Sequence, residues 1–266
     1  MFLLPKSHIP PPDAFAETIE EGLRTFICRP NRMVALRGND SAALDSIAVN
    51  LSGATIDHNR RPPPLDRSSP IPAITVGNIC ISGDPIHVLG SDFSFQFEAS
   101  NVELSQKLQP EGKLLLILHR AQDGNARFEI SRAAIENIIM KGASELAEKQ
   151  GVVIDNAKLE LTPRGPRALD GELTLTAHKL FFHPVLSLAG TFAISDEFIA
   201  TVSKLKCHGE GPIAALACAA ITPAFSKIER RGFPLSALSL GAIQLRDLAI
   251  DTADEKVVVR ARFGSV

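Results

Sequence analysis

The chain has 266 residues, of which 45% are hydrophobic and 22% charged, and its formal net charge is −2. This composition is typical of a globular protein that buries a core, and it argues against a disordered chain. The small net charge and the lack of a basic cluster argue against a nucleic-acid partner. Trp and Tyr are absent, against 14 Phe, so sites that stack sugars or bases are disfavoured.

The first predicted element is a helix that follows Pro10–Pro12, with Asp13 as its N-cap and an end near Pro30. Alternating apolar residues then predict a strand over 47–52. The stretch 59–70 is rich in Pro and Arg and is expected to be a flexible, solvated loop. The apolar stripe of the helix consists of Phe15, Ile19, Leu23 and Phe26.

The middle of the chain alternates between apolar and polar residues over long stretches, which predicts strands over 74–81 and 86–104. The tripeptide Gly83–Pro85 is expected to turn the chain between them. Two further strands, 114–118 and 126–130, are predicted to form a hairpin across 122–125. A second helix is expected to begin at Ser131 and to end near Gly151.

The rest of the chain predicts four strands, a third helix over 211–230 interrupted at Pro223, and a closing hairpin. The strands are expected over 152–161, 169–180, 186–194 and 198–205, and those of the closing hairpin over 243–251 and 256–263. This order predicts an α+β fold, with a large antiparallel sheet that carries helices on its apolar face. The whole chain 1–266 is expected to form one domain, with the N-terminal helix within 1–30.

The four cysteines, Cys28, Cys80, Cys207 and Cys218, are far apart and have no metal-ligand spacing. Two disulfides are permitted, but a chain of this size does not require them, so buried free thiols are expected. The N-terminal apolar run is too short for a signal peptide, and no stretch approaches the ~20 apolar residues of a membrane span. We therefore expect a cytoplasmic protein or one peripheral to a membrane.

No catalytic motif is present: the sequence lacks a nucleophile elbow, a zinc-protease helix, a phosphate-binding loop and a dinucleotide fingerprint. His58 follows Asp57 in a turn, where a solvated side chain is the favoured interpretation. His183 has no carboxylate or thiol near it in sequence, and Cys207 and His208 point to opposite faces of one strand. We expect no enzyme, no metal site and no cofactor.

The third helix has two interpretations of equal weight. It packs as a core helix against a sheet, or its Ala-rich, Pro-interrupted face forms one wall of an apolar cleft. The chain also resembles the bacterial LmeA-type phospholipid-binding proteins, which are grouped with the tubular lipid-binding (TULIP, BPI-like) fold. The segments that carry this resemblance are 44–57, 74–104, 128–139, 153–161, 171–176, 233–240, 243–250 and 257–261.

The resemblance implies a large curved antiparallel sheet wrapped around long amphipathic helices, with a hydrophobic groove for acyl chains. It also implies binding or carriage of a phospholipid or similar amphiphile, peripheral membrane contact and no catalysis. The candidate apolar lining is Phe15, Ile19, Phe93, Phe95, Phe97, Ile135, Ile139, Leu216, Ile221 and Phe225. Candidate headgroup contacts at the rim are Arg60, Arg61 and Arg67.

Two alternatives to lipid carriage remain open. The first is a protein-interaction or scaffold module that uses the same apolar face. The second is a lipid hydrolase or transferase that assembles a site around His183 or His208 in space. The sequence leaves the identity of the lipid, the choice between transfer and storage, and the oligomeric state undetermined.

Overall fold

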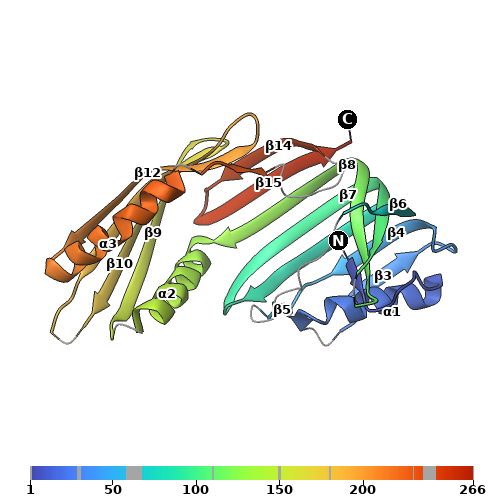
Figure 1. Cartoon of the computed structure of the whole chain (residues 1–266), viewed down its shortest axis with the longest axis horizontal. Coiled ribbons are helices and arrows are strands. Elements are labelled where there is room, and N and C mark those ends of the chain that lie inside the picture. The colour runs from blue at the N-terminus through green and yellow to red at the C-terminus, as the bar shows by residue number, and fades with distance from the viewer. Residues whose placement is uncertain are drawn as a thin grey trace.

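The computed structural model describes residues 2–28, 31–57, 68–109, 111–148, 151–179, 181–229, 231–235 and 244–265. It contains a 10-stranded sheet and a 5-stranded sheet, here called the large sheet and the small sheet. Figure 1 shows them next to each other along the long axis of the molecule, with the small sheet on the left.

The predicted sheet wrapped around long helices is wrong. Strands make up 61% of the chain and helices 18%, and neither sheet is closed or curled. The longest strands and the longest helix each have 18 residues. A strand rises about 3.3 Å per residue and a helix only 1.5 Å. The longest helix is therefore less than half as long as the longest strands, which is too short to run along the inside of a sheet wrapped around it. Each helix instead packs beside a sheet.

The large sheet has the strand order β14-β15-β8-β7-β6-β4-β3, with β1 on β8, and with β5 joining β2 to β6. Most pairs are antiparallel, but β4 and β5 run parallel to β6. Its strands are β1 (Phe2–Leu4), β2 (Ile27–Cys28), β3 (Val34–Arg37), β4 (Ala43–Asn50), β5 (Ala54–Ile56), β6 (Ile71–Val88), β7 (Ser91–Leu108), β8 (Leu114–Ser131), β14 (Gln244–Asp251) and β15 (Lys256–Gly264).

Helix α1 (Pro12–Leu23) confirms that a helix follows Pro10–Pro12, and it contacts β1 and β3 of the large sheet. It ends at Leu23 and not near Pro30, and Ile27 and Cys28 form β2. Phe15 and Ile19 are 0% and 1% exposed at the centre of the main hydrophobic core. The N-cap is Pro11 and not Asp13, which lies in the first turn without a side-chain cap bond. A carboxylate in the first turn still stabilises the positive end of the helix dipole.

Two predicted turns of the large sheet are wrong. Strand β6 continues through Gly83–Pro85 as an irregularity that contains a cis Asp84–Pro85 bond, and the chain reverses at Leu89 and Gly90. Residues 114–131 form one strand, β8, where a hairpin was predicted. Polar residues of β8 face solvent without ending it, because an antiparallel sheet tolerates one solvated face.

The small sheet has the order β13-β12-β11-β10-β9 and is antiparallel throughout. Helix α2 (Arg132–Glu148) precedes it and helix α3 (Pro212–Glu229) follows β12. Four predicted strands are confirmed here, and α3 continues through Pro223. Its strands are β9 (Val153–Gly165), β10 (Ala168–His178), β11 (Val185–Ile194), β12 (Ile199–Glu210) and β13 (Phe233–Pro234).

The chain leaves the large sheet at the end of β8 and returns to it in β14 and β15, of which β15 pairs with β8. Ser131 and Lys256 are register partners, and the backbone N–H of Arg132 donates to the carbonyl of Glu255 at 2.7 Å. The second helix thus begins where expected, and Ser131 Oγ accepts from the backbone N–H of Ala134 at 3.1 Å, as an N-cap does. Over the described ranges, no helix is long and apolar enough to cross a membrane.

Candidate ligand-binding face

One face of the small sheet is apolar across four neighbouring strands. Leu173 of β10 lies opposite Leu159 of β9 and Leu188 of β11, and Leu188 lies opposite Cys207 of β12. Directly opposite residues of an antiparallel pair share a face. We call the central part of this surface, on β10 and β11, the leucine face. It consists of Leu169, Leu173, Leu175, Leu186, Leu188 and Phe192.

The opposite face of the small sheet is polar and faces solvent. It has a shallow hollow of about 350 Å³ lined by charged and hydroxyl side chains. There Thr191 Oγ1 donates to Asp170 Oδ1 at 2.7 Å, and Arg164 pairs with the same carboxylate. The hydrogen bonds from Thr191 and Arg164 lower the pKa of Asp170 below its ordinary value. The two faces therefore differ sharply in chemistry.

Helix α3 is attached to the apolar face at β12. Cys207 of β12 and Cys218 of α3 form a disulfide, so the prediction of free thiols is wrong for these two. Cys28 and Cys80 are free and exposed, so the prediction of burial is wrong for them. A Cβ atom on Gly209 would lie 2.5 Å from the carbonyl carbon of Ala214, so the first turn of α3 approaches the strand closely. Glycine is required here for this approach.

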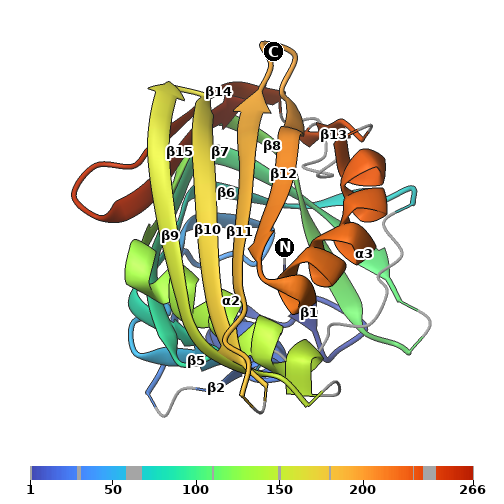
Figure 2. The ribbon, with the colours of Figure 1, turned by 90° about the vertical axis from the view of Figure 1, so that its left-hand side faces the viewer.

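Helix α2 covers the other edge of the same face. Ala157 and Leu159 of β9 are 5% and 9% exposed. Lys158 and Glu160, on the opposite face of β9, are exposed and pair with each other at 2.7 Å. The side chain of Glu136 in α2 accepts from the backbone N–H of Leu159 at 2.7 Å. In Figure 2 the strands of the small sheet pass in front of α2, and the large sheet lies behind it. Helix α2 is therefore on the face of the small sheet that is turned toward the large sheet.

Among the described residues, the two helices leave the middle of the apolar face open. Helix α2 contacts β9, and α3 contacts β12 and the neighbouring part of β11. All six side chains of the leucine face are only half-buried, whereas the core beneath the large sheet has many side chains below 5% exposure. Because a sheet normally covers its apolar face with another layer, this surface is suited to a further apolar occupant.

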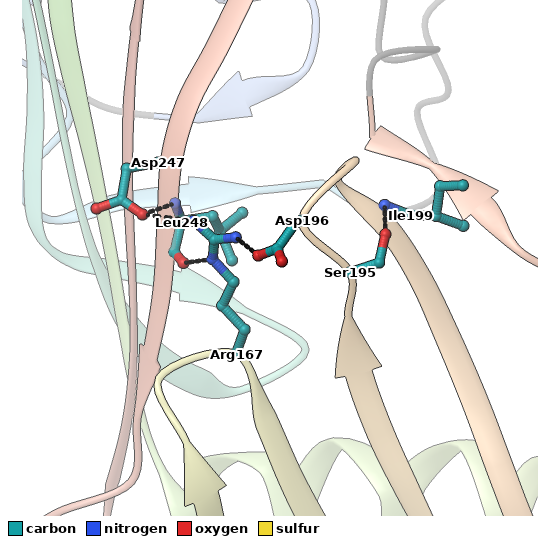
Figure 3. Close-up of polar contacts among 6 residues, drawn as sticks. All are labelled: Arg167, Ser195, Asp196, Ile199, Asp247 and Leu248. Carbon is teal, nitrogen blue, oxygen red and sulfur yellow. Dashed lines mark hydrogen bonds and ion pairs between the residues drawn. The ribbon is translucent and has the colours of Figure 1, made fainter.

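Arg167, in the turn before β10, links the small sheet to the large sheet through polar contacts, as Figure 3 shows. Arg167 Nη2 lies 2.9 Å from Asp247 Oδ1 of β14, and its Nη1 lies 3.0 Å from Asp196 Oδ1. Its Nε donates to the carbonyl of Leu248 at 3.0 Å. Its guanidinium also lies over the ring of Phe198, 5.1 Å from the centroid. The hydrogen bond from Arg167 lowers the pKa of Asp247.

The predicted lining residues are brought together only in part: Phe93, Phe95 and Phe97 pack against the main hydrophobic core that contains Phe15 and Ile19. Phe15 and Ile19 are core residues under the large sheet. Half-buried positions on β7 and α2 hold five others, Phe93, Phe95, Phe97, Ile135 and Ile139. The ring of Phe93 contacts that of Phe128, and the ring of Phe97 contacts that of Phe263; in both pairs the ring centroids are 5.3 Å apart. Leu216 is 72% exposed on α3 and Phe225 is half-buried. The side chain of Ile221, and Arg60, Arg61 and Arg67, lie outside the described residues.

Two of the seven histidines pair with carboxylates. His178 Nδ1 lies 2.6 Å from Asp155 Oδ1, and the ring of His183 is 6.3 Å from that of His178. His87 pairs with Asp92 in the same way, at 2.6 Å. In the described part of the chain, no group of three or more His, Cys, Asp and Glu side chains is placed to hold a metal ion. His58 lies outside that part.

Sequence reasoning did not select the leucine face, although it predicted the strands that carry it. The signal was available in the leucines at alternate positions of 169–175 and 186–188. What was missing was the knowledge that the described part of the chain places no layer over them. Comparison of the chain with protein-family models, curated proteins and solved structures gave no match.

Proposed function

We propose that this protein binds a phospholipid or a similar amphiphile, with the acyl chains lying on the leucine face between α2 and α3. The observation that carries the proposal is a half-buried, entirely apolar surface on β10 and β11, flanked by a helix on each side. A helix with its side chains is about 10–12 Å across, so α2 and α3 stand above the sheet. A narrow acyl chain fits such a surface better than a flat protein does.

The energetics suit carriage better than storage. Burying roughly fourteen methylenes from water stabilises a complex by about 11 kcal/mol, at about 0.8 kcal/mol each. A bilayer offers the same methylenes nearly the same environment, so exchange between the bilayer and the leucine face is close to balanced. The protein then acts as a carrier that loads and unloads at a membrane.

The disulfide between Cys207 and Cys218 bears on where this takes place. Disulfides persist in oxidising compartments and are rare where glutathione keeps thiols reduced. We therefore place the protein at the surface of a membrane in an oxidising compartment, and we discard the cytoplasmic alternative for this form of the protein.

The test is native mass spectrometry of the purified protein, followed by organic extraction and identification of the lipids. Leu188→Asp places a charge on the leucine face, and Ser187→Asp places the same charge on the opposite face of the same strand. We expect lipid adducts on the unmodified chain and on Ser187→Asp, and none on Leu188→Asp. A circular dichroism spectrum shared by both variants shows that the fold is kept.

Two outcomes would contradict the proposal. A clean mass with no uptake from mixed liposomes would favour the alternative of a protein-interaction module. Equal lipid loading of both variants would place the ligand elsewhere on the molecule.

A further inference from the structure

The turn between β10 and β11 displays two aromatic side chains to solvent. Phe181 is 93% exposed and Phe182 is 55% exposed. The turn itself is held by two backbone hydrogen bonds, from Lys179 N–H to the Phe182 carbonyl at 2.9 Å and from Phe182 N–H to the Lys179 carbonyl at 3.0 Å. These hydrogen bonds fix the backbone of the turn, and with it the positions from which the side chains of Phe181 and Phe182 project.

This turn lies at one extremity of the molecule. Figure 1 shows the far end of the small sheet at the lower left, at the end of the long axis, and Figure 2 shows the same end at the bottom. Val153, the register partner of His178, is 53% exposed beside it. Phe181, Phe182 and Val153 are thus exposed together at one end of the small sheet.

The size of this apolar tip decides which partner it fits. A Phe side chain presents about 150–250 Å², so the exposed parts of Phe181 and Phe182 together amount to roughly 300 Å². A stable protein–protein interface needs about 800 Å² on each partner. A bilayer has no such requirement, because the side chains enter it individually. Phe, with Trp and Leu, is among the side chains that interfacial segments bury at the boundary between headgroups and acyl chains.

We propose that Phe181 and Phe182 dock the protein on a phospholipid bilayer by inserting their side chains into its interface. The polar groups around them lie where headgroups and water remain. Lys179 and His183 belong to the turn itself, His178 pairs with Asp155, and Glu210 is exposed at the end of β12. This docking does not depend on the leucine face, but it would bring one end of that face to the membrane.

The absence of Trp and Tyr makes a direct test possible, because a single introduced Trp is the only such fluorophore in the chain. Phe181→Trp is mixed with phosphatidylcholine vesicles, with and without phosphatidylglycerol, and with brominated lipids as quenchers. We expect a blue shift and quenching by lipids brominated near the interface. The matched control is Phe233→Trp, since Phe233 is 53% exposed on β13 at the opposite end of the small sheet. Its emission should not change.

Flotation with the same vesicles gives the second measurement. The double variant Phe181→Ser/Phe182→Ser should bind vesicles about tenfold more weakly or worse, since it removes both apolar groups, and Phe233→Ser should bind normally. Vesicle binding without any change in the emission of Phe181→Trp would overturn the proposal, because another surface would be responsible. A chain that does not float at all would overturn it as well. Leu188→Asp separates the two proposals, since it should lose lipid uptake and keep vesicle binding.

Discussion

Arg167 lies in the turn before β10 of the small sheet, and its side chain meets that of Asp247, in β14 of the large sheet, at 2.9 Å. Between them they join the turn before β10 to strand β14. The backbone N–H of Ile250 reinforces this junction by donating to the carbonyl of Pro166 at 2.7 Å. The orientation of the small sheet, and with it the leucine face, depends on this contact at one end and on α2 at the other.

Arg167→Ala should loosen this junction. The ion pairs with exposed carboxylates contribute little, so the main loss is the hydrogen bond to the Leu248 carbonyl, about 1 kcal/mol of unfolding free energy. Hydrogen exchange at the Ile250 amide should become faster. Arg164→Ala is the matched control, because Arg164 pairs only within the small sheet, with Asp170. Unchanged exchange at Ile250 in Arg167→Ala would show that the junction does not rely on this side chain.

Gly209→Ala should displace the first turn of α3. The new Cβ would lie 2.6 Å from the Ala214 carbonyl oxygen and 2.7 Å from its Cβ, and backbone cannot move aside at low cost. We expect a loss of about 1–3 kcal/mol in chemical denaturation. At Gly171, on the same face, the nearest atom to a new Cβ is Leu161 Cδ2 at 3.5 Å. Gly171→Ala should therefore change stability by less than about 0.5 kcal/mol, and equal losses at both positions would contradict the contact.

Removal of the disulfide by Cys207→Ser/Cys218→Ser should destabilise the attachment of α3 to β12. Closing so short a loop is expected to stabilise the folded state by about 3 kcal/mol. Thermal unfolding followed by circular dichroism, with and without reductant, measures the effect. Cys28→Ser/Cys80→Ser serves as the control, because these cysteines are free. A reductant that does not shift the transition of the unmodified chain would show that the bond contributes nothing to stability.

Glu20 should make stability depend on pH. Its burial would raise its pKa, but hydrogen bonds from Arg24 and from the backbone N–H of Met33 outweigh this effect and lower the pKa below 4.5. Stability from Glu20 is therefore fully present above about pH 4.5 and is lost as the pH falls through the lower folded-state pKa. Glu20→Gln should cost about 1 kcal/mol near neutral pH and much less in acid. Urea unfolding at both pH values checks this, with Glu21→Gln, an exposed neighbour, as the control.

The sequence predicted four of the five strands of the small sheet, all three helices and the closing hairpin, because their periodicity reflects local burial. It did not predict that β8 is a single strand, since a polar Gly124 region looks like a turn when its neighbours in the sheet are unknown. Nor did it predict the bond between Cys207 and Cys218, because the distance between a strand and a helix is a tertiary quantity.

The candidate site was harder to predict for the same reason. Phe15 and Leu173 are both apolar residues in periodic segments, and only the packing shows that Phe15 is fully buried whereas Leu173 is half-buried. Whether an apolar face is exposed depends on whether another element packs over it, and the pattern of residues along a strand carries no information about that element.

The pairing of β15 with β8 has a consequence for synthesis of the chain. Ser131 and Lys256 become partners although α2, the small sheet and α3 lie between them in sequence. While those elements leave the ribosome, one side of β8 has unpaired amide and carbonyl groups over much of its length. Such an open edge can recruit a strand from another nascent chain. Aggregation before β15 emerges is thus the main hazard of this topology, and a chaperone that shields β8 would relieve it.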